Sequence, residues 1–395
     1  MLAHLNTHVP KPQESTDLPP VLLITSNASL YTGGEGIFTR QLALQLDRDG
    51  YDASILRRDW RKLAVLTRGT EPDVELPVPV GYLTIVRDLT FFILFGFLLG
   101  FARVQKRKVA VIHAQDAISA GVVGSFISIL TRTPLIITLH GLHLRSVRGI
   151  FRGHLANLAY AVALVSLRFC AKAAKSIIIV DESLRSELVR NGVRPEKIVR
   201  IPTFCRLKTA SSHRSRAEKV KLLAFIGRLS AEKNPRLIVE AFSDIIKRFP
   251  EMRLLIIGDG PERENLSHLV RERGVEKHVK ILGFRRDMEH IYSIIDALVL
   301  PSVAEGLPQV ALEAWSNEVP IIASSAVPIL TSGRDALVFE TGNRLDLERK
   351  IELLATDDEL RRRLRREGQR RLAEEFDPEK VVKLITRVYE IAQET

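Results

Sequence analysis

Two glutamates in the segment AEGLPQVALEA (residues 304–314) have a spacing that suits ligand binding. Glu305 follows the apolar run ALVLPS, and Glu313 lies eight positions later, with Pro308 between them at a favourable first position for a helix. Glu305 would then precede a helix N-terminus, whose backbone N–H groups and dipole suit a diphosphate. Both carboxylates could accept hydrogen bonds from hydroxyl groups. Taken alone, the same pattern also fits a loop surface residue and a solvated helix position.

Two cations, Arg228 and Lys233, flank the loop that follows the apolar run KLLAFIG. Cations at the end of a buried strand could stabilise a phosphate group electrostatically. The ordinary alternative is a pair of solvated surface bases, since 27% of the residues are charged. Nearer the N-terminus, Gly33, Gly34 and Gly36 follow the first apolar run, and their G-G-x-G spacing differs from the dinucleotide-binding G-x-G-x-x-G. These glycines could admit phosphate to the backbone or simply form a tight turn.

The elements that would position these residues alternate along the chain from Val21 onward. Continuous β-branched runs followed by segments of helical periodicity predict parallel strands covered by helices on both faces. We expect strands at VLLITS (21–26), KVAVIHA (108–114), PLIITLH (134–140), KSIIIV (175–180), KLLAFIG (221–227), RLLIIGDG (253–260), VKILGF (279–284), ALVLPS (297–302) and PIIAS (320–324). The predicted fold class is α/β, with two Rossmann-like doubly wound domains facing each other across a cleft. Ligands in such sheets bind beyond the carboxyl ends of the strands.

Length supports two domains, because a single core stops growing at about 250–300 residues and this chain has 395. The predicted parts are a flexible tail (1–19), an N-terminal domain (20–205), a basic linker (206–219), a C-terminal domain (220–375) and a C-terminal helix (376–395) that could pack back on the N-terminal domain. Cys170 and Cys205 are too few for a disulfide framework and lack metal-ligand spacing. With no signal-peptide pattern at the N-terminus, these features predict a cytoplasmic protein.

Five motifs together resemble the GT-B glycosyltransferases, specifically the large retaining family 4. They occur in the family's order: TGGEG (32–36), TLHG (138–141), FIGRLSAEKN (225–234), IIGDGPE (256–262) and EGLPQVALEA (305–314), which is followed by PIIAS. The resemblance covers nearly everything from Val21 to about Gln393. It implies that the N-terminal domain is the acceptor side and that the C-terminal domain binds a nucleotide sugar.

The resemblance also implies roles for single residues. Glu305 would hold the transferred hexose, and Glu313 the nucleotide ribose. The residues implied in catalysis are Glu305, His140, Arg228 and Lys233, and those implied in donor binding are Gly33, Gly34, Arg228, Lys233, Gly258, Phe284, Glu305, Gly306, Leu307 and Glu313. His113 and Asp116, in IHAQD, are candidate acceptor contacts, with packing as an equal alternative. No metal or other cofactor is implied, and the D-x-D at 47–49 has the position of a helix end.

The resulting prediction is a metal-independent retaining glycosyltransferase that moves a hexose from a nucleotide diphosphate, UDP rather than GDP, to a hydroxyl of a glycan or lipid-linked acceptor. One alternative is an epimerase or phosphorylase on the same fold. Another is a non-catalytic protein that binds an anionic surface, against which the four intact residues Arg228, Lys233, Glu305 and Glu313 argue. Nucleic acid is not expected as a partner.

Charge is divided unevenly along the chain. Residues 1–217 carry a net charge of +13, whereas residues 218–395 carry −2. The uncharged run LTFFILFGFLLGFA (89–102) is too short for the roughly 20 residues that span a bilayer, and Arg103, Lys106, Arg107 and Lys108 follow it. A second basic set, Arg145, Arg148 and Arg152, follows TLHG. We therefore predict peripheral binding to the anionic inner face of the cytoplasmic membrane; the alternative for the run itself is a buried helix.

Overall fold

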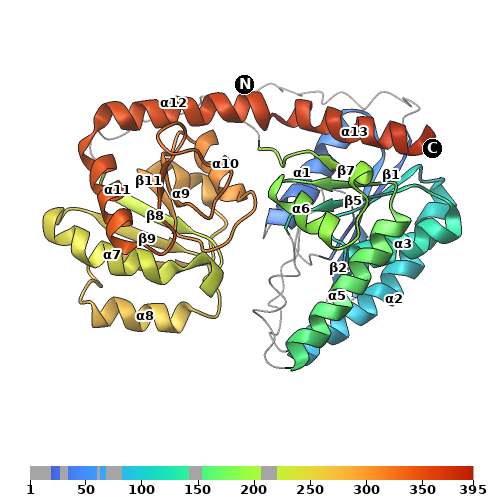
Figure 1. Ribbon diagram of the computed structural model, residues 1–395, viewed down its shortest axis with the longest axis horizontal. Coiled ribbons are helices and arrows are strands. Elements are labelled where there is room, and N and C mark those ends of the chain that lie inside the picture. Colours follow the sequence, from blue (N-terminus) through green and yellow to red (C-terminus); the bar gives the residue numbers. More distant parts are fainter. Residues whose placement is uncertain are drawn as a thin grey trace, which may run out of the picture.

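Two sheets in separate lobes organise the chain (Figure 1). The computed structural model describes residues 19–26, 34–59, 63–67, 82–141, 154–205 and 220–394. Helix α12 (Asp358–Glu375) lies along one lobe and, after a short break, is followed by α13 (Pro378–Glu394) along the other. Residues 1–18 of the predicted tail and the predicted linker 206–219 lie outside the described residues.

The first sheet has seven strands in the order β3-β2-β1-β4-β5-β6-β7, and only β2 and β3 pair antiparallel. Its strands are β1 (Val21–Thr25), β2 (Ala53–Asp59), β3 (Leu63–Thr67), β4 (Val111–Ala114), β5 (Leu135–Leu139), β6 (Ser176–Ile179) and β7 (Ile198–Arg200). The helical segments between them are α1 (Gly34–Arg48), α2 (Tyr82–Arg107), α3 (Ala120–Thr131), α5 (His154–Ala173), α6 (Ser183–Arg190) and the 3-10 turn η1 (Pro195–Lys197).

Alternation along each strand explains why both faces of the first sheet are covered. Leu22 and Ile24 of β1 pack into the layer formed by α2, α3, α5 and α6. Val21 and Leu23 point to the other face, which α1 and the C-terminal helix α13 cover. A parallel sheet buried on both faces has the continuous apolar runs that the sequence shows.

The second sheet has six strands in the order β10-β9-β8-β11-β12-β13, all parallel. Its strands are β8 (Leu222–Ile226), β9 (Arg253–Ile257), β10 (Val279–Gly283), β11 (Ala297–Leu300), β12 (Ile321–Ser324) and β13 (Leu337–Phe339). Its helical segments are η2 (Ala231–Lys233), α7 (Pro235–Arg248), α8 (Arg263–Glu272), α9 (Met288–Ile294), α10 (Gln309–Ser316) and α11 (Arg344–Thr356). One face packs on α7, α8 and α11, and the other on α9 and α10.

The α/β prediction of two doubly wound sheets is confirmed. Each of the nine predicted runs contains a strand of the structure. The sequence did not predict β2, β3, β7 and β13. Three of these lie at sheet edges, where β7 and β13 are short, and β2 ends in the charged residues Arg57, Arg58 and Asp59.

The C-terminal helix α13 is part of the first lobe's core. Its Tyr389 is buried, and the hydroxyl lies 2.7 Å from Nδ1 of His113 on β4. The other ring nitrogen of His113 lies 2.7 Å from the Thr138 hydroxyl on β5. Burial, and secondarily the nearby His140 ring, lowers the pKa of His113 to about 3. A neutral imidazole therefore ties α13 to two strands of the first sheet.

The preceding helix, α12, is fitted equally closely to the second lobe. A Cβ atom at Gly368 would lie 2.3 Å from Cδ1 of Trp315 on α10, so the two helices meet at a position without a side chain. The guanidinium of Arg371 lies 5.6 Å from the centroid of the same indole and pairs with the buried Asp335 at 2.7 Å. The consecutive helices α12 and α13 thus bind one to each lobe.

We predict that His113 makes the protein less stable as the pH falls from about 6.5 towards 3. Over this window an unfolded chain binds a proton on the imidazole, whereas the folded protein excludes it, so the free energy of unfolding falls by up to about 1.4 kcal/mol per pH unit. Urea unfolding at several pH values should show a shallower dependence for His113→Gln than for the unchanged protein. The carboxylates contribute equally to the pH dependence of the variant and of the unchanged protein. An identical dependence of the free energy of unfolding on pH in the two proteins would therefore contradict the prediction.

Candidate active site

A crevice is expected where the strand order of the second sheet reverses, between β8 and β11. The helix after β8, α7, packs on one face of the sheet, and the helix after β11, α10, packs on the other. Their connecting loops therefore diverge at the carboxyl edge of the sheet. Each loop carries residues that the sequence predicted as functional: Arg228 and Lys233 follow β8, and Glu305 follows β11.

An ion pair joins these two loops across the crevice. The Lys233 ammonium donates to Oε1 of Glu305, and the Ser302 hydroxyl donates to the same oxygen at 3.0 Å. The Glu305 side chain is only 10% exposed, and that of Lys233 27%. The backbone N–H of Val303 also donates to the carbonyl of Glu232 at 2.8 Å, which fixes the loops to each other.

Arg228 comes from the same loop as Lys233 but is not engaged in the same way. It follows Gly227 at the end of β8, and its side chain is exposed. Its guanidinium has no hydrogen-bond or ion-pair partner within the part of the chain that the structure describes. The loop after β8 thus carries one paired cation and one solvent-facing cation.

Glu313 lies on the second turn of α10 and is held by a tyrosine of α9. The buried Tyr292 hydroxyl donates to Oε2 of Glu313 at 2.8 Å. Burial, and next the charge of Glu313, raises the pKa of Tyr292 well above its ordinary value of 10. The phenol therefore stays protonated and keeps donating, which orients the carboxylate.

The glycines Gly258 and Gly227 let the loop after β9 lie against the loop after β8. Gly258 has φ +135°, and a Cβ atom there would be 1.8 Å from the carbonyl oxygen of Gly227. Backbone hydrogen bonds continue the contact, from Leu229 N–H to the Asp259 carbonyl at 2.9 Å. Phe284, just beyond β10, is exposed at the same edge of the sheet.

The first lobe contributes to this site through His140 and Gly34. A Cβ atom at Gly306 would lie 3.4 Å from the backbone oxygen of His140, which follows β5. Gly34, at the start of α1, similarly faces Gln309, the first residue of α10. The loop that carries Glu305 and the N-terminus of α10 therefore lie against the carboxyl edge of the first sheet.

The imidazole of His140 is fixed by two neighbours within its own lobe. Its Nε2 lies 3.0 Å from Oε1 of the fully buried Gln115, which follows β4. Phe38 of α1 meets the ring edge-on, with the ring centroids 4.9 Å apart. His140 is thereby held at the lobe boundary in a defined orientation.

Comparison with known proteins gives the family. The model of the glycosyl transferases group 1 matches residues 208–371, and that of the glycosyl transferase 4-like domain matches residues 33–203. The chain belongs to the group 1 glycosyltransferases. The prediction that it is an enzyme of this class is therefore confirmed.

Relatives of this glycosyltransferase are distant in sequence. The capsular polysaccharide biosynthesis glycosyltransferase CapM of Staphylococcus aureus is 24% identical, over 68% of this chain and 74% of its own length. The D-inositol 3-phosphate glycosyltransferase of Corynebacterium kroppenstedtii is 25% identical, over 83% of this chain and 79% of its own. The crystal structure of Anabaena HepE in complex with UDP-glucose has a TM-score of 0.71 at 17% identity, covering 94% of this chain and 99% of HepE. The shared fold is GT-B, as predicted.

Not every predicted residue of the glycosyltransferase reaches the crevice. His113 is fully buried with both ring nitrogens engaged, which matches the packing alternative rather than acceptor contact. Asp116 is also buried, and its carboxylate accepts hydrogen bonds from three backbone N–H groups, those of residues 118–120, at the start of α3. It caps that helix. Gly33 lies outside the described residues, whereas Gly306 and Leu307 are half-buried between β11 and α10.

Sequence reasoning missed the residues that hold the predicted ones in place. Tyr292, Ser302 and Gln115 orient Glu313, Glu305 and His140. A tyrosine at an apolar helix position is a weak signal, because a buried hydroxyl needs a partner that the sequence does not name. Among the described residues no group of three or more His, Cys, Asp or Glu side chains could hold a metal ion.

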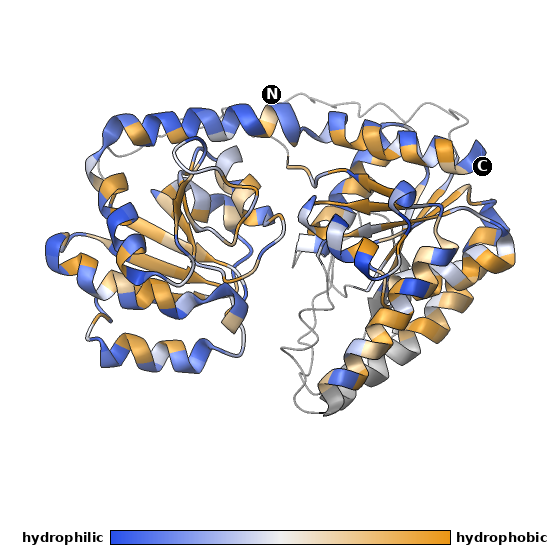
Figure 2. Cartoon of the chain, in the orientation of Figure 1, coloured by the Kyte–Doolittle hydropathy of each residue, from blue (hydrophilic) through white to orange (hydrophobic). Residues whose placement is uncertain are grey.

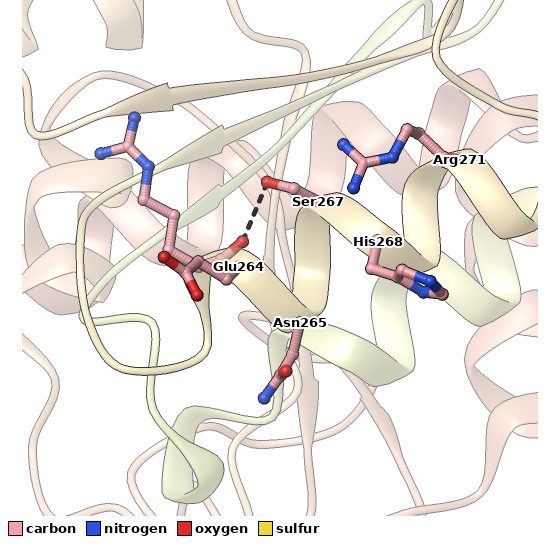
Figure 3. A pocket seen from close by; sticks show the side chains of 6 residues that line it. Glu264, Asn265, Ser267, His268 and Arg271 are labelled. Atoms are coloured by element: carbon pink, nitrogen blue, oxygen red, sulfur yellow. Dashed lines mark hydrogen bonds between the residues drawn. The ribbon is translucent and has the colours of Figure 1, made fainter.

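A second hollow lies on α8 and is not part of this site. Its lining side chains come from one helix: Arg263, Glu264, Asn265, Ser267, His268 and Arg271. Figure 3 shows the labelled side chains spreading away from one another, with one dashed hydrogen bond from the Ser267 hydroxyl to the helix backbone. Such a surface cannot enclose a ligand.

We predict that Gly258→Ala disrupts the site, because the new methyl group would collide with the Gly227 backbone. The free energy of unfolding should fall by about 1–3 kcal/mol or more. Gly274→Ala is a matched control: its φ is also positive, at +64°, but no atom lies within 4 Å of the added carbon. The control should cost only about 1 kcal/mol of backbone strain. Differential scanning calorimetry measures both, and equal losses would contradict the assigned contact.

Proposed function

We propose that this glycosyltransferase transfers a hexose with retention of configuration, from a nucleotide diphosphate donor to a hydroxyl of a glycan or lipid-linked acceptor, without a metal ion. The observation that carries the proposal is the meeting of Lys233 and Glu305 at the β8/β11 crevice, beside the exposed Arg228. The similar HepE structure contains UDP-glucose, which supports UDP rather than GDP as the nucleotide.

The diphosphate of the donor would lie between the two cations and the start of α10. Arg228 faces solvent and is available to a phosphate, and Lys233 can turn from Glu305 towards a phosphate oxygen. Backbone N–H groups at the N-terminus of α10 add favourable dipoles. Preorganised cations of this kind stabilise the charge that develops on a leaving diphosphate, which is the task a metal performs elsewhere.

The two carboxylates would then hold the two sugars of one donor. Oε1 of Glu305 is engaged by Lys233 and Ser302, whereas Oε2 has no partner among the described residues and can accept from a hexose hydroxyl. Glu313, oriented by Tyr292, is placed to accept from the ribose hydroxyls. Gly306 leaves room beside the backbone of His140, where the hexose would meet the acceptor side.

Transfer would follow a front-face route. The acceptor oxygen forms a bond to C1 of the hexose on the face from which the C1–O bond to the β-phosphate breaks. The electron pair of that bond goes to the departing phosphate oxygen, and the acceptor proton passes to a phosphate oxygen of the same leaving group. Arg228 and Lys233 stabilise the charge at this stage. The protein supplies no covalent nucleophile, and it positions both substrates.

The location proposed for the reaction is the cytoplasm, at the inner face of the membrane. The net charge of +13 on residues 1–217 supports it, since the other part of the chain is close to neutral. A lipid-linked acceptor would be reached there by the first lobe.

Lys233→Ala should lower the turnover number by about 10²-fold or more, the scale of losing one preorganised group at the transition state. Transfer by the unchanged enzyme should survive EDTA. Release of UDP from UDP-sugars in a coupled assay measures both. Lys247→Ala is the control, because it removes an exposed lysine of α7 that pairs only with Asp244 at the surface. Full dependence on added Mn²⁺ or Mg²⁺ would refute the metal-free proposal.

Glu305→Ala and Glu313→Ala should fail in different ways. The first should abolish transfer while leaving the affinity for free UDP within about threefold, because UDP lacks the hexose. The second should weaken UDP binding itself by about tenfold or more, the scale of losing a charged hydrogen bond. Isothermal titration with UDP separates the two. Equal losses of UDP affinity would show that the two sugars are assigned wrongly.

A further inference from the structure

Exposed apolar side chains gather on three adjacent helices of the first lobe. The described residues include seventeen large apolar side chains that are exposed, and ten of them lie on α2, α3 and α5. These ten are Leu94, Phe95, Leu98, Leu99, Phe126, Ile129, Leu130, Leu158, Val162 and Val165. Figure 2 shows the matching hydrophobic colour along α5 and α2. We call these ten residues and the helices that carry them the α2–α3–α5 face.

The face is continuous because α3 packs against both of its neighbours. Gly100 of α2 lies against Ile127 of α3, where an added Cβ would be 2.6 Å from the side chain. Phe126 of α3 meets Phe169 of α5, with ring centroids 5.3 Å apart. A contiguous apolar surface of this kind on a soluble domain marks a binding site for another apolar surface.

The ten exposed residues lie on the side of their helices that does not pack against the sheet. On α5, Leu158, Val162 and Val165 follow one another at helical intervals on the outside. Ala163 and Leu167 of the same helix are at most 4% exposed and belong to the core. The helix therefore has two apolar sides, one packed on the sheet and one with no packing partner among the described residues.

The charges around the face are predominantly positive, although α2 also carries Asp88 before its apolar run. From residue 89 to residue 180 the sequence holds eleven Lys and Arg and one acid, Asp116, which is buried as the cap of α3. Exposed cations follow the apolar stripe of each helix: Lys106 and Arg107 on α2, Lys108 directly after it, Arg132 after α3, and Arg168 and Lys172 on α5. Since all three helices lead into parallel strands, their C-terminal ends lie at one edge of the sheet.

We propose that the α2–α3–α5 face inserts into the interfacial region of an anionic bilayer. An apolar surface whose neighbouring charges are predominantly cationic is complementary to acyl chains beneath anionic headgroups. A second copy of this chain fits less well, because a two-fold contact would bring the same cations opposite each other. From residue 89 to residue 180 the sequence offers no acid that could pair with them except the buried Asp116.

The helices lie on the membrane rather than crossing it. Within the described residues one segment, Ala156–Ala173 of α5, is long and apolar enough to span a bilayer, and only 22% of it is buried. A core helix of a soluble protein would be mostly buried. Its inner side nevertheless packs on the sheet through Ala163, Leu167 and Cys170, so α5 cannot leave the lobe without opening the core. Shallow insertion of the outer side satisfies both observations.

This orientation would bring the site close to the membrane. The apolar residues of α5 lie in its first two-thirds, towards the carboxyl edge of the sheet, where His140 follows β5. The α2 helix is about 39 Å long at 1.5 Å per residue, so it extends beyond the short strand β4 towards the same edge. That the acceptor is membrane-bound rests on the proposed function, whereas docking of the face does not.

One cation that the sequence assigned to membrane binding has another role. Arg103 pairs with Asp52 at 3.5 Å and donates to the Ser54 hydroxyl at 3.3 Å, so its charge is used within the lobe. Arg145, Arg148 and Arg152 lie outside the described residues. The basic variant that tests the proposal is therefore Lys106→Gln, Arg107→Gln and Lys108→Gln without Arg103.

Vesicle flotation of the full-length chain tests the proposal without any donor or acceptor. The unchanged protein should bind to vesicles made of equal parts of phosphatidylglycerol and phosphatidylcholine. It should bind much less to vesicles of phosphatidylcholine alone. Val162→Glu combined with Val165→Glu, at positions 56% and 65% exposed, should lower the partition coefficient about tenfold or more. The matched control, Leu345→Glu with Leu384→Glu at 58% and 52% exposure on α11 and α13, should bind normally. The triple basic variant should lose the salt-sensitive part of binding.

Three results would overturn the proposal: no binding to anionic vesicles at low salt, equal losses in the α5 variant and its control, or a dimer in sedimentation equilibrium that only the α5 substitutions dissociate. The last would assign the face to a second copy. Thermal melting of each variant confirms that these exposed substitutions leave the fold intact. UDP titration of the α5 variant is expected to be unchanged, so failure of membrane docking and failure of the donor assignment give separate readouts.

Discussion

The change of strand order between β8 and β11 is the constraint on which the rest of the site depends. The loops that follow parallel strands begin at one edge of the sheet. Because α7 and α10 cover opposite faces, the loops after β8 and β11 run in different directions from that edge. A crevice between diverging loops is the place where side chains from distant parts of the sequence can meet. Lys233 and Glu305, 72 residues apart, form their ion pair across it. The contact of Gly258 with Gly227 then holds the loop after β9 against the loop after β8, and a larger residue at position 258 would separate the two loops.

A second constraint keeps the first sheet opposite this crevice. The helices α12 and α13 follow each other directly, but α12 is fitted to the second lobe through Gly368 and Trp315, and α13 to the first through Tyr389 and His113. Where the described chain leaves the first lobe, Cys205 N–H donates to the carbonyl of Phe376 at 3.2 Å. The last described residue of the first lobe, Cys205, therefore lies beside the junction of α12 and α13. Near this junction the lobes also meet through small contacts: the Gln309 amide donates to the Phe204 carbonyl at 3.2 Å, and Gly306 faces the His140 backbone.

Periodicity was sufficient to predict nine of the strands and the two sheets, because a buried parallel strand must be apolar on both faces. The motif positions of Glu305, Lys233 and Arg228 followed from the same strand ends. The partners could not be predicted, because Tyr292 comes from another helix and only tertiary packing brings it to Glu313. For His113 the sequence left acceptor contact and packing equally open, and the structure engages both of its ring nitrogens within the core. The run 89–102 was ambiguous for a related reason: Phe92 is buried and Leu94 exposed, and an apolar residue fits either side.

The ion pair of Lys233 and Glu305 has a further consequence for donor binding. Two charges in a half-buried crevice each lose hydration, and either one left alone would be unfavourable there. Paired, they hold each other in position while the crevice is empty of donor. In the proposed function, a donor diphosphate would compete for Lys233 with more negative charge than one carboxylate carries, and a hexose hydroxyl would donate to Glu305 in place of the ammonium. Each partner would thus be replaced as it is released, so the pair would keep both side chains oriented for the proposed donor without a large cost when the donor arrives. A nucleotide without its sugar would release Lys233 and leave Glu305 with the Ser302 hydroxyl alone, which favours the complete donor over the free nucleotide.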